Sequence, residues 1–280
     1  MLRDGVGVEA NAEEAEYYFE RSAELGNPHA QYALAKMYLS GGDQEKLTAA
    51  VELLQKSADG GNPTAQYALG KLFRDGEHLE KDIARAVELF IQSAEQKNDY
   101  AAYALGKLYR DGADVEKDIA AAIRWLTESA EQGNQFAQYA LGKLYLAGED
   151  VQAAIRWLTE SAEQGNQFAQ YQLGKLYIMG KDVPRDREEA LRWLTMAAEQ
   201  GNEYAQFFID HIDEFRDPSL AMAATRLLRQ LGKIFEQQNR QLESDPSMQI
   251  DRKRMRILRE KKMAQGHARD DHEPKHTGGV

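Results

Sequence analysis

Residues 123–146 read IRWLTESAEQGNQFAQYALGKLYL, and residues 155–178 repeat this stretch almost unchanged. Only two of the 24 positions differ, since Ala140 is matched by Gln172 and Leu146 by Ile178. Self-similarity at a fixed spacing is the signature of a repeat architecture. The rest of the chain, up to about residue 215, consists of looser copies of the same unit.

A Gly-Asn or Lys-Asn step marks the register of each copy. Successive asparagines lie 35, 36, 36, 32 and 36 residues apart, at Asn27, Asn62, Asn98, Asn134, Asn166 and Asn202. A period of this size, with no proline inside the apolar segments, is typical of one helix-turn-helix per repeat. The sequence therefore predicts an all-α fold, an α-α superhelical solenoid over residues 1–215.

The first helix of each repeat begins at the Asn, which we count as position 0 and expect to cap the free amides of the helix. Position 3 is alanine in all six repeats, position 7 is leucine or isoleucine, and position 8 is alanine once and then glycine four times. At about 100° per residue these positions share one arc, which predicts a packed face that lets helices approach closely. The second helix supplies the partner stripe, including Trp125, Trp157 and Trp193, which we interpret as packing residues.

The pattern A-x-x-x-L-G-x-x-Y followed by A-x-x-W-L-x-x-S-A-x-x-G-N, seen in residues 137–145 and 154–166, resembles Sel1-like repeats, which are relatives of the tetratricopeptide repeat. The resemblance covers roughly residues 1–215. It implies a right-handed superhelix of α-hairpins whose concave surface, lined by the first helices, binds peptides or proteins. A fold by itself does not name the partner.

Positions 2, 5, 9 and 12 of the first helix project about opposite to the packed arc. Position 5 is a tyrosine and position 9 a lysine in five successive repeats, and residues four apart lie on one helical face. The resulting partner-binding residues would be Tyr32, Lys36, Tyr67, Lys71, Tyr103, Lys107, Tyr139, Lys143, Tyr171 and Lys175. Such rings and cations would bind an extended segment of another protein that carries acidic groups. Alternatively, the tyrosines pack against the neighbouring first helix and the lysines form a solvated face.

Two irregularities interrupt the pattern. Residues 1–5 (MLRDG) match residues 108–112 (LYRDG), so the chain starts in mid-repeat, and the helix expected at about 12–25 lacks a helix to cover Tyr17, Tyr18 and Phe19. We therefore expect the sequence to be a fragment or the C-terminal part of a longer protein. The repeat from Asn134 is four residues short, and its turn LAGEDVQAA is expected to disturb one edge of the stack locally.

Residues 216–243 are predicted to form a C-terminal capping helix, because apolar residues recur there at intervals of three and four after an Asp-Pro-Ser start. Residues 244–280 carry nine Lys and Arg against six Asp and Glu, whereas the whole chain has a net charge of −11. A basic helix is expected at 251–263, followed by a disordered polar end. Its candidate phosphate contacts are Arg252, Lys253, Arg254, Arg256, Arg259, Lys261 and Lys262.

The run DPSLAMAATRLLRQLGKIF, with the basic stretch after it, resembles the tail that follows Sel1-like repeats in some mobilisation relaxases of bacterial conjugative elements. That resemblance implies an alternative function, a DNA-associated accessory region whose tail contacts nucleic acid. Alternatively, the tail is a solvated helix or folds back on the acidic repeats. The nicking domain of such proteins needs a His-rich metal site, which this sequence lacks.

Catalytic signatures are missing from the sequence. It has no H-E-x-x-H, no G-x-S-x-G and no phosphate-binding glycine loop, and it contains no cysteine. We expect no cofactor. We also expect no bound metal, because we interpret the histidines of HARDDHEPKH as part of the disordered polar end. No apolar run approaches the ~18 residues of a membrane span. The sequence thus predicts a cytoplasmic, non-enzymatic scaffold that binds a protein or an extended peptide.

Overall fold

The computed structural model describes residues 11–41, 44–180 and 183–216, together with Ala223 and Leu227. Within these residues it contains twelve α-helices, one short 3₁₀ helix (Glu214–Arg216) and no strand, so the predicted all-α class is confirmed. The chain divides into two units, residues 1–213 and residues 214–280, and the twelve α-helices belong to the first. The predicted capping helix at 216–243 and the tail at 244–280 fall almost entirely outside the described residues.

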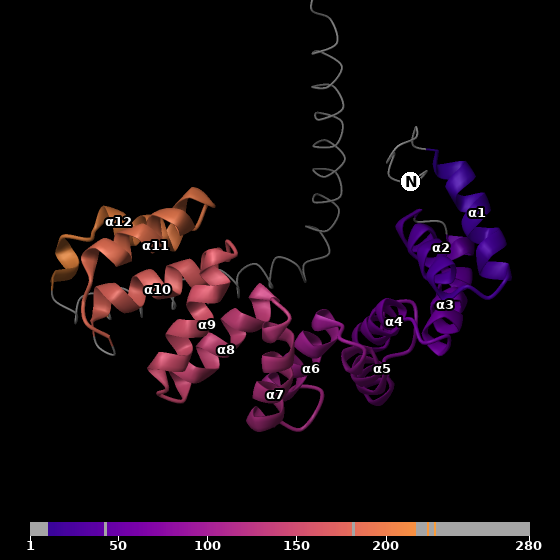
Figure 1. Cartoon of the computed structure of the whole chain (residues 1–280), viewed down its shortest axis with the longest axis horizontal. Helices are drawn as coiled ribbons and strands as arrows, with labels where there is room; N and C mark the ends of the chain where they lie inside the picture. The colour runs from indigo at the N-terminus through magenta and orange to yellow at the C-terminus, as the bar shows by residue number, and fades with distance from the viewer. Residues whose placement is uncertain (1–10, 42–43, 181–182, 217–222, 224–226, 228–280) are drawn as a thin grey trace, which may run out of the picture. The chain divides into compact units, whose positions relative to one another are not determined.

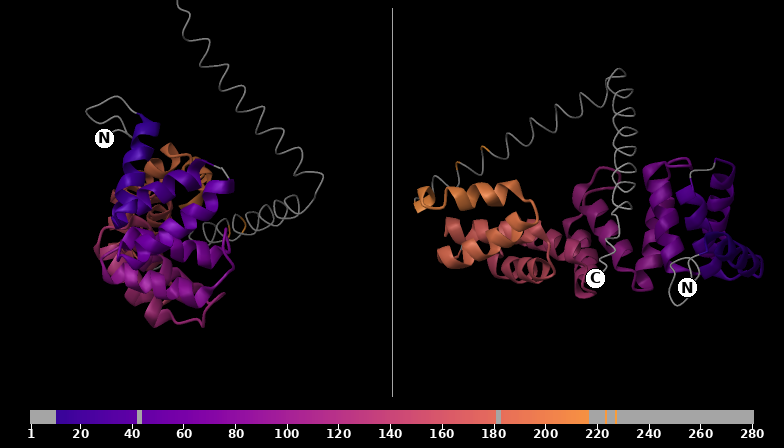
Figure 2. Two further views of the ribbon diagram at one scale, coloured as in Figure 1. Left: turned by 90° about the vertical axis from the view of Figure 1, so that its right-hand side faces the viewer. Right: turned by 90° about the horizontal axis from the view of Figure 1, so that it is seen from above.

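The helices form consecutive antiparallel hairpins that follow one another in chain order (Figures 1 and 2). We call the even-numbered helices, which start after the repeat asparagines, A helices: α2 (Pro28–Gly41), α4 (Pro63–Asp75), α6 (Asp99–Asp111), α8 (Gln135–Ala147), α10 (Gln167–Met179) and α12 (Glu203–Asp210). The odd-numbered helices are B helices: α1 (Ala12–Glu24), α3 (Gln44–Asp59), α5 (Ile83–Glu95), α7 (Ile119–Glu131), α9 (Val151–Glu163) and α11 (Arg187–Glu199).

Each turn from a B helix to an A helix uses the same local chemistry. The Asn side chain accepts hydrogen bonds from the first-turn amides; Asn166, for example, accepts from Phe168 at 3.0 Å and from Ala169 at 3.2 Å. The residue before it has a left-handed backbone, with φ of +91° at Gly165 and +66° at Lys97, where lysine replaces glycine. The predicted capping role of the asparagines is confirmed, and it fixes where every A helix begins.

The predicted packed face is also confirmed. Leu141 and Leu158 are fully buried, and a Cβ added at Gly142 would lie 2.5 Å from the Cγ of Leu158. Gly106 and Gly174 stand in the same relation to Leu126 and Leu194, also at 2.5 Å. Glycine at position 8 is therefore what allows each B helix to lie close against its A helix, as in other closely packed interiors.

The tryptophans pack within the stack, as predicted. Trp157 is 5% exposed and Trp193 is 4% exposed, and each lies in an apolar cluster that includes residues of the preceding hairpin. The equivalent residue of the first B helix, Tyr18, is 56% exposed. Burial at this position is thus supplied by the hairpin before it.

Buried hydrogen bonds join the two helices of each of these hairpins. The hydroxyl of Ser129 donates to the carbonyl of Asp99 at 2.7 Å, and Ser161 donates to the carbonyl of Gln135 at 2.7 Å. Both serines are fully buried. Since an unpaired buried hydroxyl would be costly, these bonds fix how the B helix lies against the start of its A helix.

The shortened turn keeps the closure of its hairpin. The amide of Asp150 donates to the carbonyl of Tyr145 at 3.0 Å, just as the amide of Asp118 donates to the carbonyl of Tyr109 at 3.0 Å in the preceding, longer turn. The left-handed residue after the helix is Glu149 (φ +65°) rather than a glycine such as Gly112 (φ +64°). The missing residues therefore change the loop and not the way the two helices are joined.

Candidate functional site

Positions 2, 5, 9 and 12 of the A helices form the surface that we call the open face. Its tyrosines at position 5 are partly buried, and those of α4, α6, α8 and α10 each contact a ring of the next A helix. The ring of Tyr103 lies 6.3 Å, centroid to centroid, from that of Phe136, and the ring of Tyr139 lies 6.1 Å from that of Phe168. These separations are within the range of favourable aromatic pairs. The lateral packing considered from the sequence is therefore present.

The second member of each ring pair stands at position 2 and is exposed. Tyr100 is 54% exposed, Phe136 48%, Phe168 53% and Tyr204 44%. Two further pairs, Tyr67 with Tyr100 and Tyr171 with Tyr204, have centroid separations of 6.1 Å. Because positions 2 and 5 are one helical turn apart, the pairs join into one line of rings, the aromatic stripe, made of Tyr67, Tyr100, Tyr103, Phe136, Tyr139, Phe168, Tyr171 and Tyr204.

The rings at position 2 are not among the site residues predicted from the sequence. The signal was available, since an aromatic residue recurs three positions before the tyrosine in the repeats from Asn98 onward. The repeats from Asn27 and Asn62 carry His29 and Thr64 there instead. What the sequence could not show is that each of these rings covers the tyrosine of the preceding repeat.

The lysines at position 9 lie over the rings of the stripe. The Nζ atoms of Lys71, Lys107 and Lys143 are 6.0, 5.7 and 5.6 Å from the ring centroids of Tyr67, Tyr103 and Tyr139. All three side chains are exposed, and none forms an ion pair with a carboxylate in the part of the chain that the structure describes. Their charge is thus available to a guest, and their attraction to the ring face holds them on the stripe.

The two ends of the predicted lysine series differ from its centre. On α2, Tyr32 is partly buried and Lys36 is exposed. On α10, Lys175 lies 5.6 Å from the ring centroid of Tyr171 but is only 9% exposed. Of the predicted site residues, the lysines of α4, α6 and α8 are exposed and lie over partly buried tyrosines, whereas Lys175 is covered.

Arginines extend the open face at the ends of α4 and α6. The Nε of Arg74 lies 2.7 Å from Oδ1 of Asp75, and that of Arg110 lies 2.7 Å from Oδ1 of Asp111. The bond from Arg74 holds the pKa of the Asp75 carboxyl below its usual range. Burial raises the pKa of the Tyr103 and Tyr139 phenols, and the charge of Arg110 opposes the rise at both, so this guanidinium lies near two rings of the stripe.

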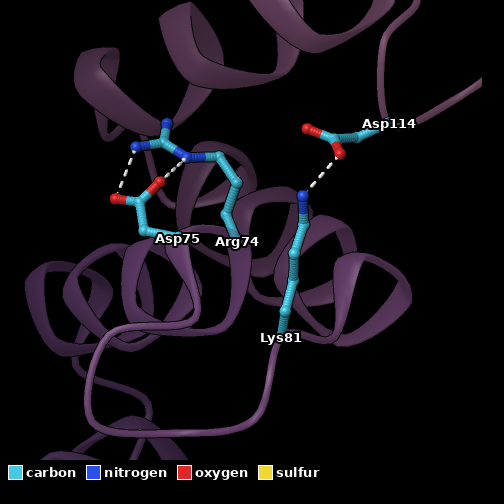
Figure 3. A network of polar contacts seen from close by, with 4 residues as sticks. All are labelled: Arg74, Asp75, Lys81 and Asp114. Atoms are coloured by element: carbon cyan, nitrogen blue, oxygen red, sulfur yellow. Dashed lines mark hydrogen bonds and ion pairs between the residues drawn. The ribbon is translucent and has the colours of Figure 1, made fainter. Parts of the chain in front are cut away.

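A small cavity opens beside these charges. It has a volume of about 190 Å³, and its lining includes Arg74, Lys107, Asp111 and Asp114. Figure 3 shows two ion pairs beside the cavity. Arg74 is paired with Asp75, and the Nζ of Lys81, in the loop after α4, lies 2.7 Å from Oδ1 of Asp114. The cavity is large enough for one side chain of a guest but not for a drug-sized ligand.

The predicted nucleic-acid contacts Arg252, Lys253, Arg254, Arg256, Arg259, Lys261 and Lys262 lie outside the described residues and stay a prediction. Among the described residues, no group of three or more His, Asp or Glu side chains is arranged to hold a metal ion. None of the described helices combines the length and the apolar character that a bilayer span requires.

Comparison with known proteins agrees with the repeat register. The Sel1 repeat model matches six segments, residues 1–27, 28–62, 63–98, 99–134, 135–166 and 167–202. Two similar crystal structures are c5321, a protective antigen of uropathogenic Escherichia coli strains (37% identity, TM-score 0.68, 74% of this chain covered), and a Sel1 repeat protein from Oxalobacter formigenes (33% identity, TM-score 0.66, 76% covered).

The chain spans 45% and 63% of the lengths of these two proteins. No curated protein sequence matches it.

Proposed function

We propose that this chain, which belongs to the Sel1 repeat family, is a non-enzymatic scaffold that binds an extended, acidic segment of another protein along its open face. Members of the family typically mediate protein–protein interactions. The observation that carries the proposal for this chain is the combination of a line of partly and half-exposed rings with ammonium groups that have no carboxylate partner among the described residues. Exposed apolar surface of this continuity is typical of interaction sites.

The rings would supply most of the affinity. Tyrosine and phenylalanine offer large, rigid contact areas, and four of the rings of the stripe are about half exposed before any partner binds. An exposed ion pair contributes only about 0–1 kcal/mol, so the lysines alone would not hold a guest. Their role is to favour an acidic partner and to accelerate its association, which makes binding weaker at high salt.

The repeat spacing favours an extended guest. An extended chain advances about 3.3 Å per residue, and packed helices lie about 8–10 Å apart, so about three residues of a guest pass each A helix. The same ring, tyrosine and lysine return on α6 and α8, and a guest with a short apolar and acidic repeat could use each set in turn. A guest of about twelve residues would cross α4, α6, α8 and α10.

The proposal is tested with a fluorescein-labelled peptide of about twelve residues in which Glu alternates with Phe or Leu. Fluorescence anisotropy with the whole chain should show saturable binding. The double variant Lys107→Glu, Lys143→Glu should weaken it by about tenfold or more, which corresponds to about 1.4 kcal/mol. The matched control is Lys56→Glu, a charge reversal at an exposed lysine of the B helix α3.

Binding that is lost equally in the Lys56→Glu control would show that only net charge matters. Absence of saturable binding by the wild-type chain would refute the proposal for this class of peptide.

A further inference from the structure

The open face changes in character along the array. At position 12, α4 and α6 carry Arg74 and Arg110, whereas α8 and α10 carry Leu146 and Ile178. At position 13, the first two helices carry Asp75 and Asp111, whereas the next two carry Ala147 and Met179. At position 2 the residue is Thr64 on α4, Tyr100 on α6 and phenylalanine on α8 and α10.

The part over α4 and α6, the charged half, is a network of ion pairs with an excess of positive charge. Arg74, Arg110 and Lys81 are paired with the carboxylates of Asp75, Asp111 and Asp114, respectively. Lys71 and Lys107 are exposed and carry two further positive charges, and neither forms an ion pair within the described residues. The cavity in this half is lined by Arg74 and Lys107 and by two carboxylates, Asp111 and Asp114, which are already paired with Arg110 and Lys81. A carboxylate side chain of a guest would meet Lys107 there.

The part over α8 and α10, the apolar half, offers rings and few charges. Phe136 and Phe168 are each about half exposed, and both rest on tyrosines of the stripe. Leu146 is partly buried and Ile178 is 1% exposed, so no ion pair replaces those of Arg74 and Arg110 here. Lys143 is the exposed lysine of this half, whereas Lys175 is 9% exposed. An apolar or aromatic segment would cover these phenylalanines.

The shortened turn contributes to the difference. In the charged half, the ion pair between Lys81 and Asp114 connects the loops after α4 and α6 (Figure 3). Lys117 is the equivalent of Lys81 in the next repeat, but the shortened loop after α8 has no counterpart of Asp114. Its Asp150 corresponds to Asp118 and caps α9 by accepting from the amide of Ala153 at 3.1 Å. Among the described residues Lys117 has no ion pair, so the loop edge beside the apolar half is shorter and not closed in this way.

We infer that the open face binds a two-part segment in one orientation, with the acidic part of the segment over the charged half and its aromatic or aliphatic part over the apolar half. This inference rests on the proposed function and adds to it which helices receive which chemistry. Placing the guest the other way would leave its carboxylates over Phe136 and Phe168, where Lys143 is the exposed lysine at position 9. It would also place the apolar side chains of the guest against the ion pairs of α4 and α6. In both mismatches, charged groups lose contact with water and gain no polar partner in its place.

The test uses two peptides of about twelve residues, each with six acidic residues followed by six apolar ones. One carries benzoylphenylalanine at its acidic end and the other at its apolar end. After irradiation with the whole chain, mass spectrometry locates the cross-links. We expect the acidic-end probe to label α4 and α6 and the apolar-end probe to label α8 and α10. The double variant Phe136→Thr, Phe168→Thr, which introduces the residue found at position 64, should reduce labelling by the apolar-end probe.

The outcomes separate the two proposals. Saturable cross-linking of the open face by both probes, with each end reaching both halves equally, would overturn the placement while leaving the binding function intact. Cross-links from the acidic end on α8 and α10 and from the apolar end on α4 and α6 would also overturn the placement. Labelling that is not saturable, or that falls on the B helices, would overturn the proposed function together with the placement.

Discussion

On α8, Leu141 and Gly142 pack against α9, whereas Phe136 and Lys143, on the other side of the same helix, remain exposed. The packed side has the same glycine at position 8 in α6, α8 and α10, because a Cβ there would collide with a leucine of the B helix in each case. The open side keeps a tyrosine and a lysine but varies at positions 2 and 12. Helix packing therefore constrains the residues on one side of each A helix, while the residues on the other side can vary and contact a partner.

The largest expected loss of stability comes from the packed side. Trp157→Ala should lower the free energy of unfolding by about 3–5 kcal/mol, because it removes a buried indole and leaves a cavity between hairpins. Tyr18→Ala, at the equivalent position of α1, should cost far less, since Tyr18 is 56% exposed. Urea denaturation followed by circular dichroism measures both. Equal losses in the two variants would contradict the statement that the preceding hairpin buries this position.

A second variant probes close approach on the packed side. Gly142→Ala should destabilise the protein by about 1–3 kcal/mol although alanine is the better helix former, because the new methyl would lie 2.5 Å from Leu158. The control is Gly148→Ala just after the same helix, where the nearest atom is a carbonyl oxygen at 3.6 Å. Thermal denaturation of both variants measures the difference. A stabilised Gly142→Ala variant would show that α9 can move away without cost.

The capping asparagines should contribute less. Asn166→Ala removes the acceptor for the amides of Phe168 and Ala169 and should cost about 1 kcal/mol. Asn166→Asp retains the acceptor and should preserve most of the stability. Hydrogen exchange of the α10 amides gives the measurement, with faster exchange expected in the alanine variant. Identical exchange in both variants would mean that the cap is dispensable.

The smallest effect on stability is expected on the open side. Phe136→Thr removes one partner of an aromatic pair on a half-exposed surface, so it should cost no more than about 1.5 kcal/mol. Lys143→Gln should cost at most about 1 kcal/mol, the size of an exposed cation–π contact. Urea denaturation checks both values. A loss comparable to that of Trp157→Ala would show that the open side is part of the core.

The packed side was predictable because its pattern is local. Alanine at position 3, leucine at position 7 and glycine at position 8 recur within single helices, and helical periodicity places them on one arc. The asparagine caps were predictable for the same reason. The serine bonds, such as that from Ser129 to the carbonyl of Asp99 across 30 residues, were not, because they depend on how the two helices of a hairpin lie against each other.

The open side was predicted only in part. The tyrosines and lysines were visible because they lie four residues apart within each helix, but the pairing of Tyr103 with Phe136 is a contact between repeats. Burial of Lys175 could not be read from the sequence, since its repeat is almost identical to the one in which Lys143 is exposed. The shortened turn was expected to disturb the edge of the stack; it keeps the hairpin closed and alters only the loop contacts.

The most direct test of the central claim compares peptide affinity between exposed apolar residues of the two sides. The double variant Phe136→Thr, Phe168→Thr is measured against Ile119→Thr, a B-helix residue that is 39% exposed. Anisotropy with the alternating acidic and apolar peptide should show at least about tenfold weaker binding for the double variant, or about 1.4 kcal/mol, and an unchanged affinity for Ile119→Thr. Unchanged affinity of the double variant, or an equal loss in both, would contradict the assignment of binding to the open face.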